Sequence, residues 1–239
     1  MKIDIITIFP EMFTCFLNNS IISRAIKDNK IIINIVNLRD FSHNKHKTID
    51  DSIYGGGAGM LMQFPPIYDA VASLKTDNSK IIYLSPQGKV FNQKKAIKLS
   101  KENHLIFICG HYEGIDARVL EIVDYEISIG DYVLTGGELP VMAVVDSITR
   151  LLDGVITKES QTEDSLYNGL LKYPQYTKPK EYKGYEVPPI LLSGNHEKID
   201  EYREYESIKN TFLKRRDLLK NKKLTSKQEK MLENIKHNL

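Results

Sequence analysis

The 239-residue sequence contains no tryptophan, only two cysteines and no long hydrophobic run. Cys15 and Cys109 lie far apart, which disfavours a disulfide-stapled scaffold and favours a reducing cytoplasm. No apolar segment approaches the roughly 20 residues that a transmembrane helix needs. The first residues, Met1–Asp4, include an acid, and no small-residue cleavage site follows, so a signal peptide is disfavoured. We therefore expect a cytoplasmic protein that does not associate with membranes.

Net charge is also small, at +2, but it is unevenly distributed. From Lys198 to Leu239, twelve Lys and Arg residues stand against seven Asp and Glu residues, a surplus of five, so the preceding residues carry a deficit of three. A basic segment on a near-neutral body is compatible with a polyanionic partner. It is also compatible with an ordinary solvated helical surface, and the charge pattern alone leaves both interpretations open.

The motifs of several common sites are missing as well. The sequence has no G-x-x-x-x-G-K-[ST] motif and no G-x-G-x-x-G after a predicted strand, which disfavours P-loop and dinucleotide sites. His43 and His46 have no Cys or carboxylate partner at zinc spacing, so a role on a surface loop is preferred. Cys109 ends an apolar run and is expected to be a buried structural thiol.

What the sequence does contain is a regular alternation of apolar runs and helical spacing, which predicts an α/β fold with a mostly parallel sheet. Ten of the fourteen glycines lie between Gly55 and Gly137, in predicted loops that follow strands. Because ligands bind beyond the carboxyl ends of parallel strands, the loops after the last three strands point to one pocket. Strands are predicted at 2–8, 31–36, 80–84, 104–109 and 125–129, and helices at 11–27, 66–74, 92–101, 115–123 and 141–152.

Three loops carry the chemistry: 85–88, 110–114 and 128–140. In the last, Gly130, Gly136 and Gly137 would let the backbone approach a ligand closely, and Pro140 suits the first turn of the helix that follows. Taken singly, each is also compatible with an ordinary turn or helix start. None of them contains the Lys or Arg that a phosphate site requires. Together they predict a pocket for a cationic or uncharged polar ligand with a flat part of adenine size.

The loop sequences resemble the three cofactor loops of the bacterial tRNA (guanine-N1-)-methyltransferase family, part of the SPOUT superfamily of S-adenosylmethionine-dependent RNA methyltransferases. The resemblance rests on Tyr83–Gly88, Cys109–Asp116 and Ser128–Pro140, and it extends through 8–13, 50–51, 54–60, 176–179, 187–189 and 193–196. It implies a trefoil-knotted site for S-adenosylmethionine, and the family alone suggests magnesium. The implied cofactor-binding residues are Tyr83, Leu84, Ser85, Pro86, Gly110, Tyr112, Glu113, Gly114, Ser128, Ile129, Gly130, Tyr132, Leu134, Gly136, Gly137 and Pro140.

The resemblance also implies a homodimer whose active sites use both subunits, and a tRNA substrate methylated at N1 of the guanine 3′ to the anticodon, guanosine 37. Guanine N1 carries a proton near neutral pH, so a base must remove it while charge builds on O6. The resemblance assigns the base to Asp164 and the O6-stabilising cation to Arg150. The residues by themselves suggest only a helix N-cap and a solvated helix end. Ordering of the linker on RNA binding is our hypothesis for how Asp164 joins the site.

The predicted domains are a cofactor-binding domain at 1–156, a linker at 157–168 and a small, basic, all-helical tRNA-binding domain at 169–239. Lysines and tyrosines interleave from Lys172 to Tyr185, a pattern compatible with phosphate contact and base stacking or with a packed interdomain surface.

Three departures from the family pattern affect the expected RNA contacts: His111 in place of Arg, Ser52-Ile53 in place of Arg-Pro, and Lys172 in place of Asp. The alternatives are a SPOUT methyltransferase of another RNA site, a non-catalytic RNA-binding protein, and a small-molecule enzyme with a nucleotide cofactor.

Overall fold

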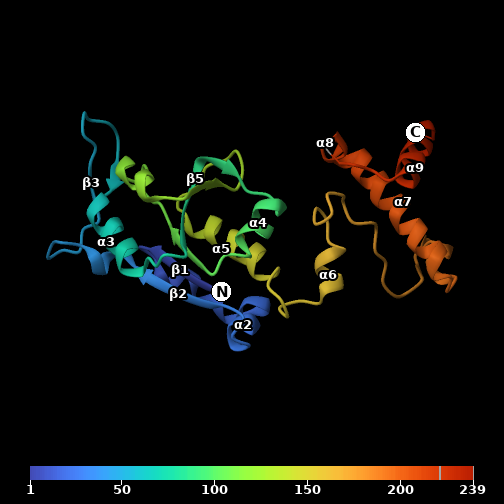
Figure 1. The fold of residues 1–239 in the computed structure, drawn as a ribbon, viewed down its shortest axis with the longest axis horizontal. Coiled ribbons are helices and arrows are strands. Elements are labelled where there is room, and N and C mark those ends of the chain that lie inside the picture. The colour runs from blue at the N-terminus through green and yellow to red at the C-terminus, as the bar shows by residue number, and fades with distance from the viewer. Residues whose placement is uncertain (221, 239) are drawn as a thin grey trace. The chain divides into compact units, whose positions relative to one another are not determined.

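The computed structural model describes residues 1–220 and 222–238, which form two compact units, Met1–Thr157 and Lys158–Leu239 (Figure 1). The division falls at the start of the segment predicted as a linker, and the short helix α6 (Lys158–Thr162) occupies part of that segment. Within the described residues, no helix is both long enough and apolar enough to cross a membrane.

Unit one is built on a five-stranded parallel sheet with the strand order β2–β1–β6–β5–β7. The first strand in the sequence, β1, lies in the interior of the sheet, and Lys2 lies opposite both Ile32 and His104. The parallel arrangement confirms the predicted α/β fold. The strands are β1 (Lys2–Thr7), β2 (Ile32–Asn37), β5 (Ser79–Val90), β6 (His104–Ile108) and β7 (Tyr125–Ser128).

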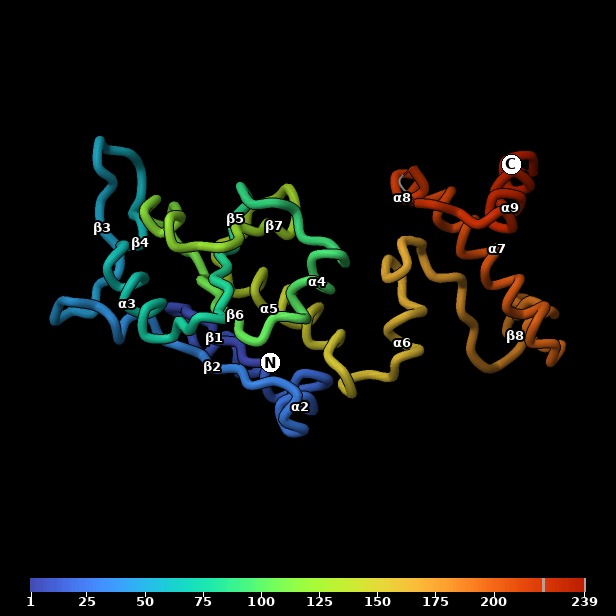
Figure 2. The backbone as a smooth tube through the Cα atoms, in the orientation of Figure 1, coloured from blue at the N-terminus to red at the C-terminus, as the bar shows by residue number. Residues whose placement is uncertain are grey.

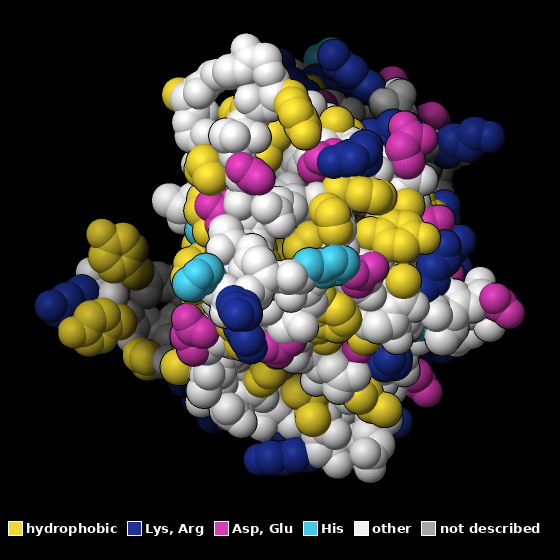
Figure 3. Space-filling view, turned by 90° about the vertical axis from the view of Figure 1, so that its left-hand side faces the viewer, with side chains coloured by type: hydrophobic (Ala, Val, Ile, Leu, Met, Phe, Trp, Pro, Cys, Tyr) yellow, Lys and Arg dark blue, Asp and Glu magenta, His cyan; other side chains and the backbone are white. Residues whose placement is uncertain are grey.

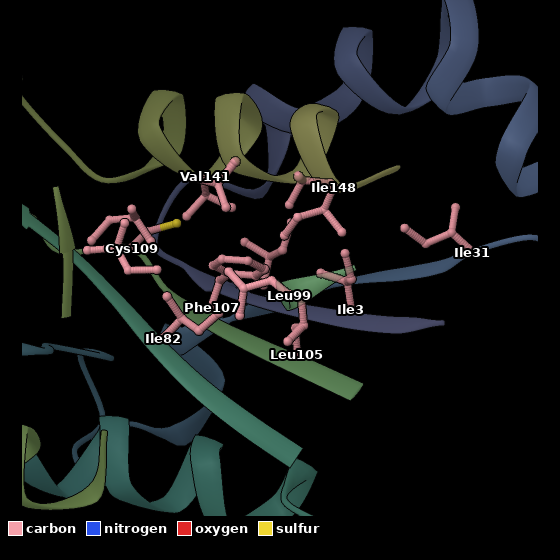
Figure 4. Packing of buried hydrophobic residues seen from close by; sticks show 14 of the residues in the cluster. Ile3, Ile31, Ile82, Leu99, Leu105, Phe107, Cys109, Val141 and Ile148 are labelled. Atoms are coloured by element: carbon pink, nitrogen blue, oxygen red, sulfur yellow. The ribbon is translucent and has the colours of Figure 1, made fainter. Parts of the chain in front are cut away.

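Helices cover both faces of this sheet (Figure 2), because alternate residues of a strand point to opposite faces. On one face, Ile3 and Phe107 pack with residues of α2 (Ser20–Lys27), α4 (Gln93–Leu99) and α5 (Glu138–Thr149). Figure 4 shows Val141 and Ile148 pointing from α5 toward the sheet. On the other face, Ile106 packs with residues of α3 (Phe64–Leu74) and of the 3-10 helix η3 (Ala117–Ile122). The central strands are therefore buried on both faces, as parallel sheets require.

The single helix predicted at 11–27 is wrong, since the segment divides into η1 (Pro10–Phe13), α1 (Thr14–Asn18) and α2. Asn19 is extended and Ser20 has a φ of 56°, which interrupts the helix. The side-chain amides of Asn18 and Asn19 donate to the carbonyls of Thr14 and Cys15. Such local bonds compete with helix continuation, and the apolar spacing does not register them. The helix predicted at 115–123 is likewise a 3-10 helix.

The strand predicted at 80–84 does not end in a simple turn. Strand β5 continues to Val90, but Leu84 and Lys89 both pair with Ile127, so residues 85–88 bulge out of the ladder. A Cβ atom on Gly88 would lie 2.5 Å from the Ile127 amide nitrogen, which explains why glycine occupies this position. The bulge gives the loop its projection from the sheet. A second feature not predicted is the hairpin of β3 (Asp50–Ser52) and β4 (Met60–Met62), which flanks the glycine-rich segment 55–59.

A buried polar cluster occupies the amino ends of the strands. The fully buried Asp4 carboxylate lies 2.8 Å from the Lys2 ammonium and 2.6 Å from His104 Nε2, and it accepts a hydrogen bond of 2.8 Å from Asn34. Burial by itself would raise the pKa of Asp4, but the hydrogen bonds from Lys2, Asn34 and His104 together hold this pKa below its ordinary value. Ser79 Oγ lies 2.7 Å from the other ring nitrogen of His104. The cluster ties four strands, β1, β2, β5 and β6, together at the end of the sheet opposite the loops.

Unit two has its own small core of Leu170, Ile208, Met231 and Ile235, formed around α7 (His196–Lys214) and α9 (Ser226–His237), with α8 (Arg216–Lys220) between them. Beside the helices, β8 (Glu181–Tyr182) and β9 (Tyr185–Glu186) form a short hairpin, followed by the 3-10 helix η4 (Pro189–Leu192). This hairpin departs from the all-helical prediction. Lys183 and Gly184, with φ of 54° and 83°, form the two-residue turn that matches the twist of a hairpin.

Candidate functional site

The three loops predicted from sequence converge on one cavity of about 450 Å³ at the carboxyl ends of β5, β6 and β7. All sixteen residues predicted to bind the cofactor line this cavity, which we call the loop cavity. Its volume lies in the range typical of small-molecule sites. Residues that the sequence prediction missed also line it: Gln87, His111, Ile115, Ala117, Leu120, Glu126, Ile127, Val133 and Thr135. Most of these neighbour predicted residues, so widening each motif by a few positions would have found them.

At two glycines, Gly110 and Gly137, the walls of the loop cavity are formed by close packing of the backbone. The Gly137 amide donates to the Gly110 carbonyl at 2.8 Å. A Cβ atom on Gly137 would lie 2.8 Å from Cys109 Cα and 2.8 Å from the Gly110 nitrogen. A Cβ atom on Gly110 would in turn lie 2.9 Å from the Tyr83 ring. Only glycine fits at both positions, and the three loops are therefore locked against one another.

The lining is acidic in the sense that Glu113 and Glu126 are present, while no Lys or Arg of the described residues lines the loop cavity. Burial, and then the nearby Glu126, raises the pKa of Tyr83 to about 12, so this phenol stays neutral at physiological pH. Burial, and then Glu138, raises the pKa of the Cys109 thiol well above its usual range, which agrees with the predicted structural role. On the face of the molecule shown in Figure 3, acidic, basic and hydrophobic side chains are mixed.

Two acids of the 128–140 loop do not line the loop cavity: Asp131 and Glu138. Glu138 is 1% exposed and accepts a hydrogen bond of 2.7 Å from Thr7 Oγ1. Its other oxygen lies 3.5 Å from Nε2 of His111, whose ring packs edge-on against Phe9 with the centroids 4.9 Å apart. Glu138 therefore helps to hold His111 in place, although Glu138 does not itself line the cavity. His111, one of the departures from the family pattern, does line it.

The predicted catalytic residues belong to different units. Arg150 is the C-cap of α5 in unit one, where its amide donates to the Asp146 carbonyl at 3.1 Å. Asp164 belongs to unit two and lines a cavity of about 320 Å³ there. No described helix begins at Asp164, so the N-cap interpretation is wrong. The Lys172 ammonium lies 3.9 Å from the Asp164 carboxylate, and the two side chains are 21% and 30% exposed.

Hydrogen bonds within unit two hold the segment that carries Asp164. The Lys172 amide donates to Ser165 Oγ at 2.9 Å, and the Leu171 amide donates to Thr211 Oγ1 at 2.9 Å. Ser207 Oγ donates to the Leu171 carbonyl at 2.6 Å. Because Ser207 and Thr211 both lie on α7, this helix is the support on which the 165–172 segment rests.

In the described part of the chain, no group of three or more His, Cys, Asp or Glu side chains is arranged to bind a metal ion.

The sequence matches the family described as "tRNA (Guanine-1)-methyltransferase TrmD" over residues 1–221. The tRNA (guanine-N(1)-)-methyltransferase of Aster yellows witches'-broom phytoplasma is 57% identical over 240 residues, covering 100% of this chain and 99% of the relative. The proteins of the same name from Fusobacterium nucleatum and Dictyoglomus turgidum are 54% and 53% identical; they cover 99% and 100% of this chain and 98% of each relative. The chain therefore belongs to the tRNA (guanine-1)-methyltransferase family.

Proposed function

We propose that the protein transfers a methyl group from S-adenosylmethionine to N1 of guanosine 37, the residue 3′ to the anticodon of tRNA. Family membership supports the coarser statement that it is a tRNA (guanine-N1)-methyltransferase. The observation that carries the proposal is the loop cavity, in which all sixteen residues expected to bind the methyl donor come together.

The loop cavity fits S-adenosylmethionine in size and charge. Its volume of about 450 Å³ suits a nucleoside with an amino acid tail. Glu113 and Glu126 complement a sulfonium and an ammonium, and a lining without Lys or Arg does not repel them. The glycine-rich walls offer backbone N–H and C=O groups to the edge of an adenine. When bound, S-adenosylmethionine supplies a methyl group attached to a positively charged sulfur.

The chain's own residues then handle the proton and the charge. We assign Asp164 to accept the proton from guanine N1, which frees the lone pair that bonds to the methyl carbon. Arg150 stabilises the negative charge that develops on O6. Both are residue types suited to these roles, and the hydrogen bonds to α7 hold the Asp164 segment in a defined conformation. We assign no step to magnesium.

The length of α5 supports a homodimer in which Arg150 serves the partner's cavity. Pro140 of α5 lines the loop cavity, and Arg150 caps the opposite end of the same helix. Ten residues of α-helix separate them, a distance of roughly 15 Å. An arginine side chain does not extend this far from Arg150 to Pro140, which supports the proposal that Arg150 acts at the partner's cavity.

The proposed function is tested with methyl-labelled S-adenosylmethionine and tRNA transcripts that carry either guanine or adenine at position 37. We expect label only on the transcript with guanine, at N1. Equal labelling of both transcripts would point to another RNA site, and labelling of neither would favour a non-catalytic RNA-binding protein.

The shared site is tested with heterodimers of two defective subunits, Arg150→Ala and Gly137→Ala. If Arg150 acts on the partner's cavity, the heterodimer contains one complete site and recovers up to half of the wild-type activity. If Arg150 acts within its own subunit, both sites are defective and the heterodimer is as inactive as either parent.

A further inference from the structure

Unit two contains a cavity of about 570 Å³ that neither the loop motifs nor the proposed catalytic residues account for. It lies among the 173–180 segment, η4 and α7, and we call it the lysine–tyrosine cavity. Lys178, Lys180 and Arg203 line it, and no Asp or Glu of the described residues does so. Neither of the two lysines forms an ion pair with a described residue. Arg203 is ion-paired with Asp200 at 3.3 Å, so among the described residues the unpaired positive charge of the cavity comes from Lys178 and Lys180.

Aromatic and aliphatic groups form the rest of its wall. Tyr173 is held in place by a hydrogen bond of 3.0 Å from its hydroxyl to Glu163, and the Arg203 guanidinium lies 5.1 Å from the centre of its ring. Tyr176 is 47% exposed, and its hydroxyl interacts with that of Tyr202. Val187, Leu191 and Ile199 add an apolar floor. A flat ring entering this cavity would meet the half-exposed Tyr176 and an apolar floor.

This combination fits one class of ligand. Tyrosine faces stack on nucleobases of any sequence, and lysines contact the flanking phosphates. We propose that the lysine–tyrosine cavity binds one unpaired nucleotide of the tRNA substrate, with the base against Tyr176 and the phosphates at Lys178 and Lys180. The inference rests on the proposed function, since it names a contact made by the RNA that this function methylates. Of the two interpretations of the Lys/Tyr segment, the proposal adopts RNA contact.

The ring and the charges are tested separately in the full-length protein, by methyl transfer at varied tRNA concentration. Tyr176→Ala should raise the KM for tRNA about ten-fold, whereas Tyr176→Phe, which keeps the ring, should change it less than two-fold. Lys178→Gln with Lys180→Gln should raise this KM about ten-fold at 200 mM salt. The control double variant Lys198→Gln with Lys230→Gln removes two exposed lysines that do not line the cavity. In every variant kcat and the Kd for S-adenosylmethionine should stay within two-fold of wild type.

A direct reporter is available because the chain has no tryptophan. Tyr176→Trp creates a single indole in the cavity, and we expect its fluorescence to be quenched when tRNA is added and to recover in high salt. An unquenched indole under conditions where tRNA binds would overturn the inference. So would a Tyr176→Ala variant, folded by its melting curve, whose KM equals that of Tyr176→Phe. If wild-type protein methylates no tRNA, the proposed function fails instead, and the quenching experiment still tests whether the cavity binds RNA.

Discussion

The loop cavity and the lysine–tyrosine cavity differ in both charge and construction. The loop cavity carries two glutamates and no Lys or Arg, and the lysine–tyrosine cavity carries three cations and no Asp or Glu, within the residues that the structure describes. The first is walled by glycine backbone packed on backbone, the second by tyrosine rings and aliphatic side chains. A backbone wall fixes the shape around a small cationic ligand, and side chains on a surface can follow a polyanion. If the two proposals hold, the difference teaches that one chain separates donor binding from RNA binding by the sign of the charge in each cavity.

The largest expected effect is a loss of kcat without a loss of donor or tRNA binding, which would separate the catalytic step from binding in the two cavities. Asp164→Asn should lower kcat at least 100-fold, because an amide cannot accept the N1 proton. Single-turnover methyl transfer measures this effect, and Kd values for S-adenosylmethionine and tRNA should remain within two-fold of wild type. Glu159→Gln, at an exposed carboxylate on α6, is the matched control and should keep full activity. If Asp164→Asn turns over as fast as wild type, the base lies elsewhere.

Alkaline pH should reveal the buried phenol of the loop cavity. The folded-state pKa of Tyr83, about 12, lies above the unfolded value near 10. The stability that neutral Tyr83 contributes is therefore fully present below pH 10 and is lost as pH rises from 10 to 12, by about 2 to 3 kcal/mol. Urea unfolding at pH 9 and 11.5 measures this loss. Tyr83→Phe should lose correspondingly less, and identical pH dependence of the two proteins would contradict the assignment.

A single added methyl group should disrupt the backbone packing in the wall of the loop cavity. Gly137→Ala places a methyl group 2.8 Å from the backbone of Cys109 and Gly110, which cannot move aside cheaply. We expect a loss of about 1 to 3 kcal/mol in the free energy of unfolding and at least a ten-fold weaker Kd for S-adenosylmethionine. Gly184→Ala, at a hairpin turn with no atom within 4 Å of the new methyl, is the comparison. It should cost about 1 kcal/mol through its positive φ alone and leave donor binding intact.

Salt should distinguish the two cavities without any mutation. Between 50 and 200 mM salt, the affinity for tRNA should fall at least ten-fold, because each phosphate contact releases a counterion. The Kd for S-adenosylmethionine should change less than two-fold, since no Lys or Arg lines the loop cavity. Calorimetry for the donor and filter binding for tRNA give the two slopes. Equal slopes would show that the separation by charge is not real.

The smallest effect concerns the contact between Lys172 and Asp164. At 3.9 Å and partly exposed, this ion pair contributes at most about 1 kcal/mol, so Lys172→Gln should change kcat by less than about five-fold. Steady-state kinetics at saturating substrates measures this. A loss approaching that of Asp164→Asn would mean that Lys172 itself takes part in the reaction.

Much of unit one follows from local signals in the sequence. The continuous apolar runs of β1 and β6, which are buried almost throughout, and the glycine loops after the last three strands are enough to predict a parallel sheet with a pocket at its carboxyl edge. The bulge after Leu84 is not predictable in this way, because it depends on how Lys89 pairs with a strand 38 residues later. The break at Asn19 is also missed, since competing side-chain bonds leave the apolar spacing unchanged.

The candidate site can also be divided into features that have a local signal in the sequence and features that depend on long-range packing. Gly110 and Gly137 stand out in the sequence. From the sequence alone, the only explanation for glycine at these positions is that it lets the backbone approach a ligand closely. The structure adds that each also accommodates a neighbouring loop. The sequence shows the lysine–tyrosine cavity only as an interleaved pattern that allows two interpretations. The third cation of this cavity, Arg203, comes from a helix and lies 23 residues after Lys180, so it is not part of that pattern. Long-range packing of this kind has no local signal.

The interior position of β1 in the sheet has a consequence for synthesis on the ribosome. This strand is made first, yet one of its two neighbours, β6, begins about 100 residues later, with Lys2 opposite His104. Until then, one edge of an apolar strand has no partner, and such edges invite pairing with other chains. Because most of the sheet's contacts are distant in sequence, folding of unit one is expected to be slow and to finish only after β7 has emerged. We therefore expect the incomplete sheet to be prone to aggregation during synthesis, and unit two, with its own core, can fold afterwards as a separate step.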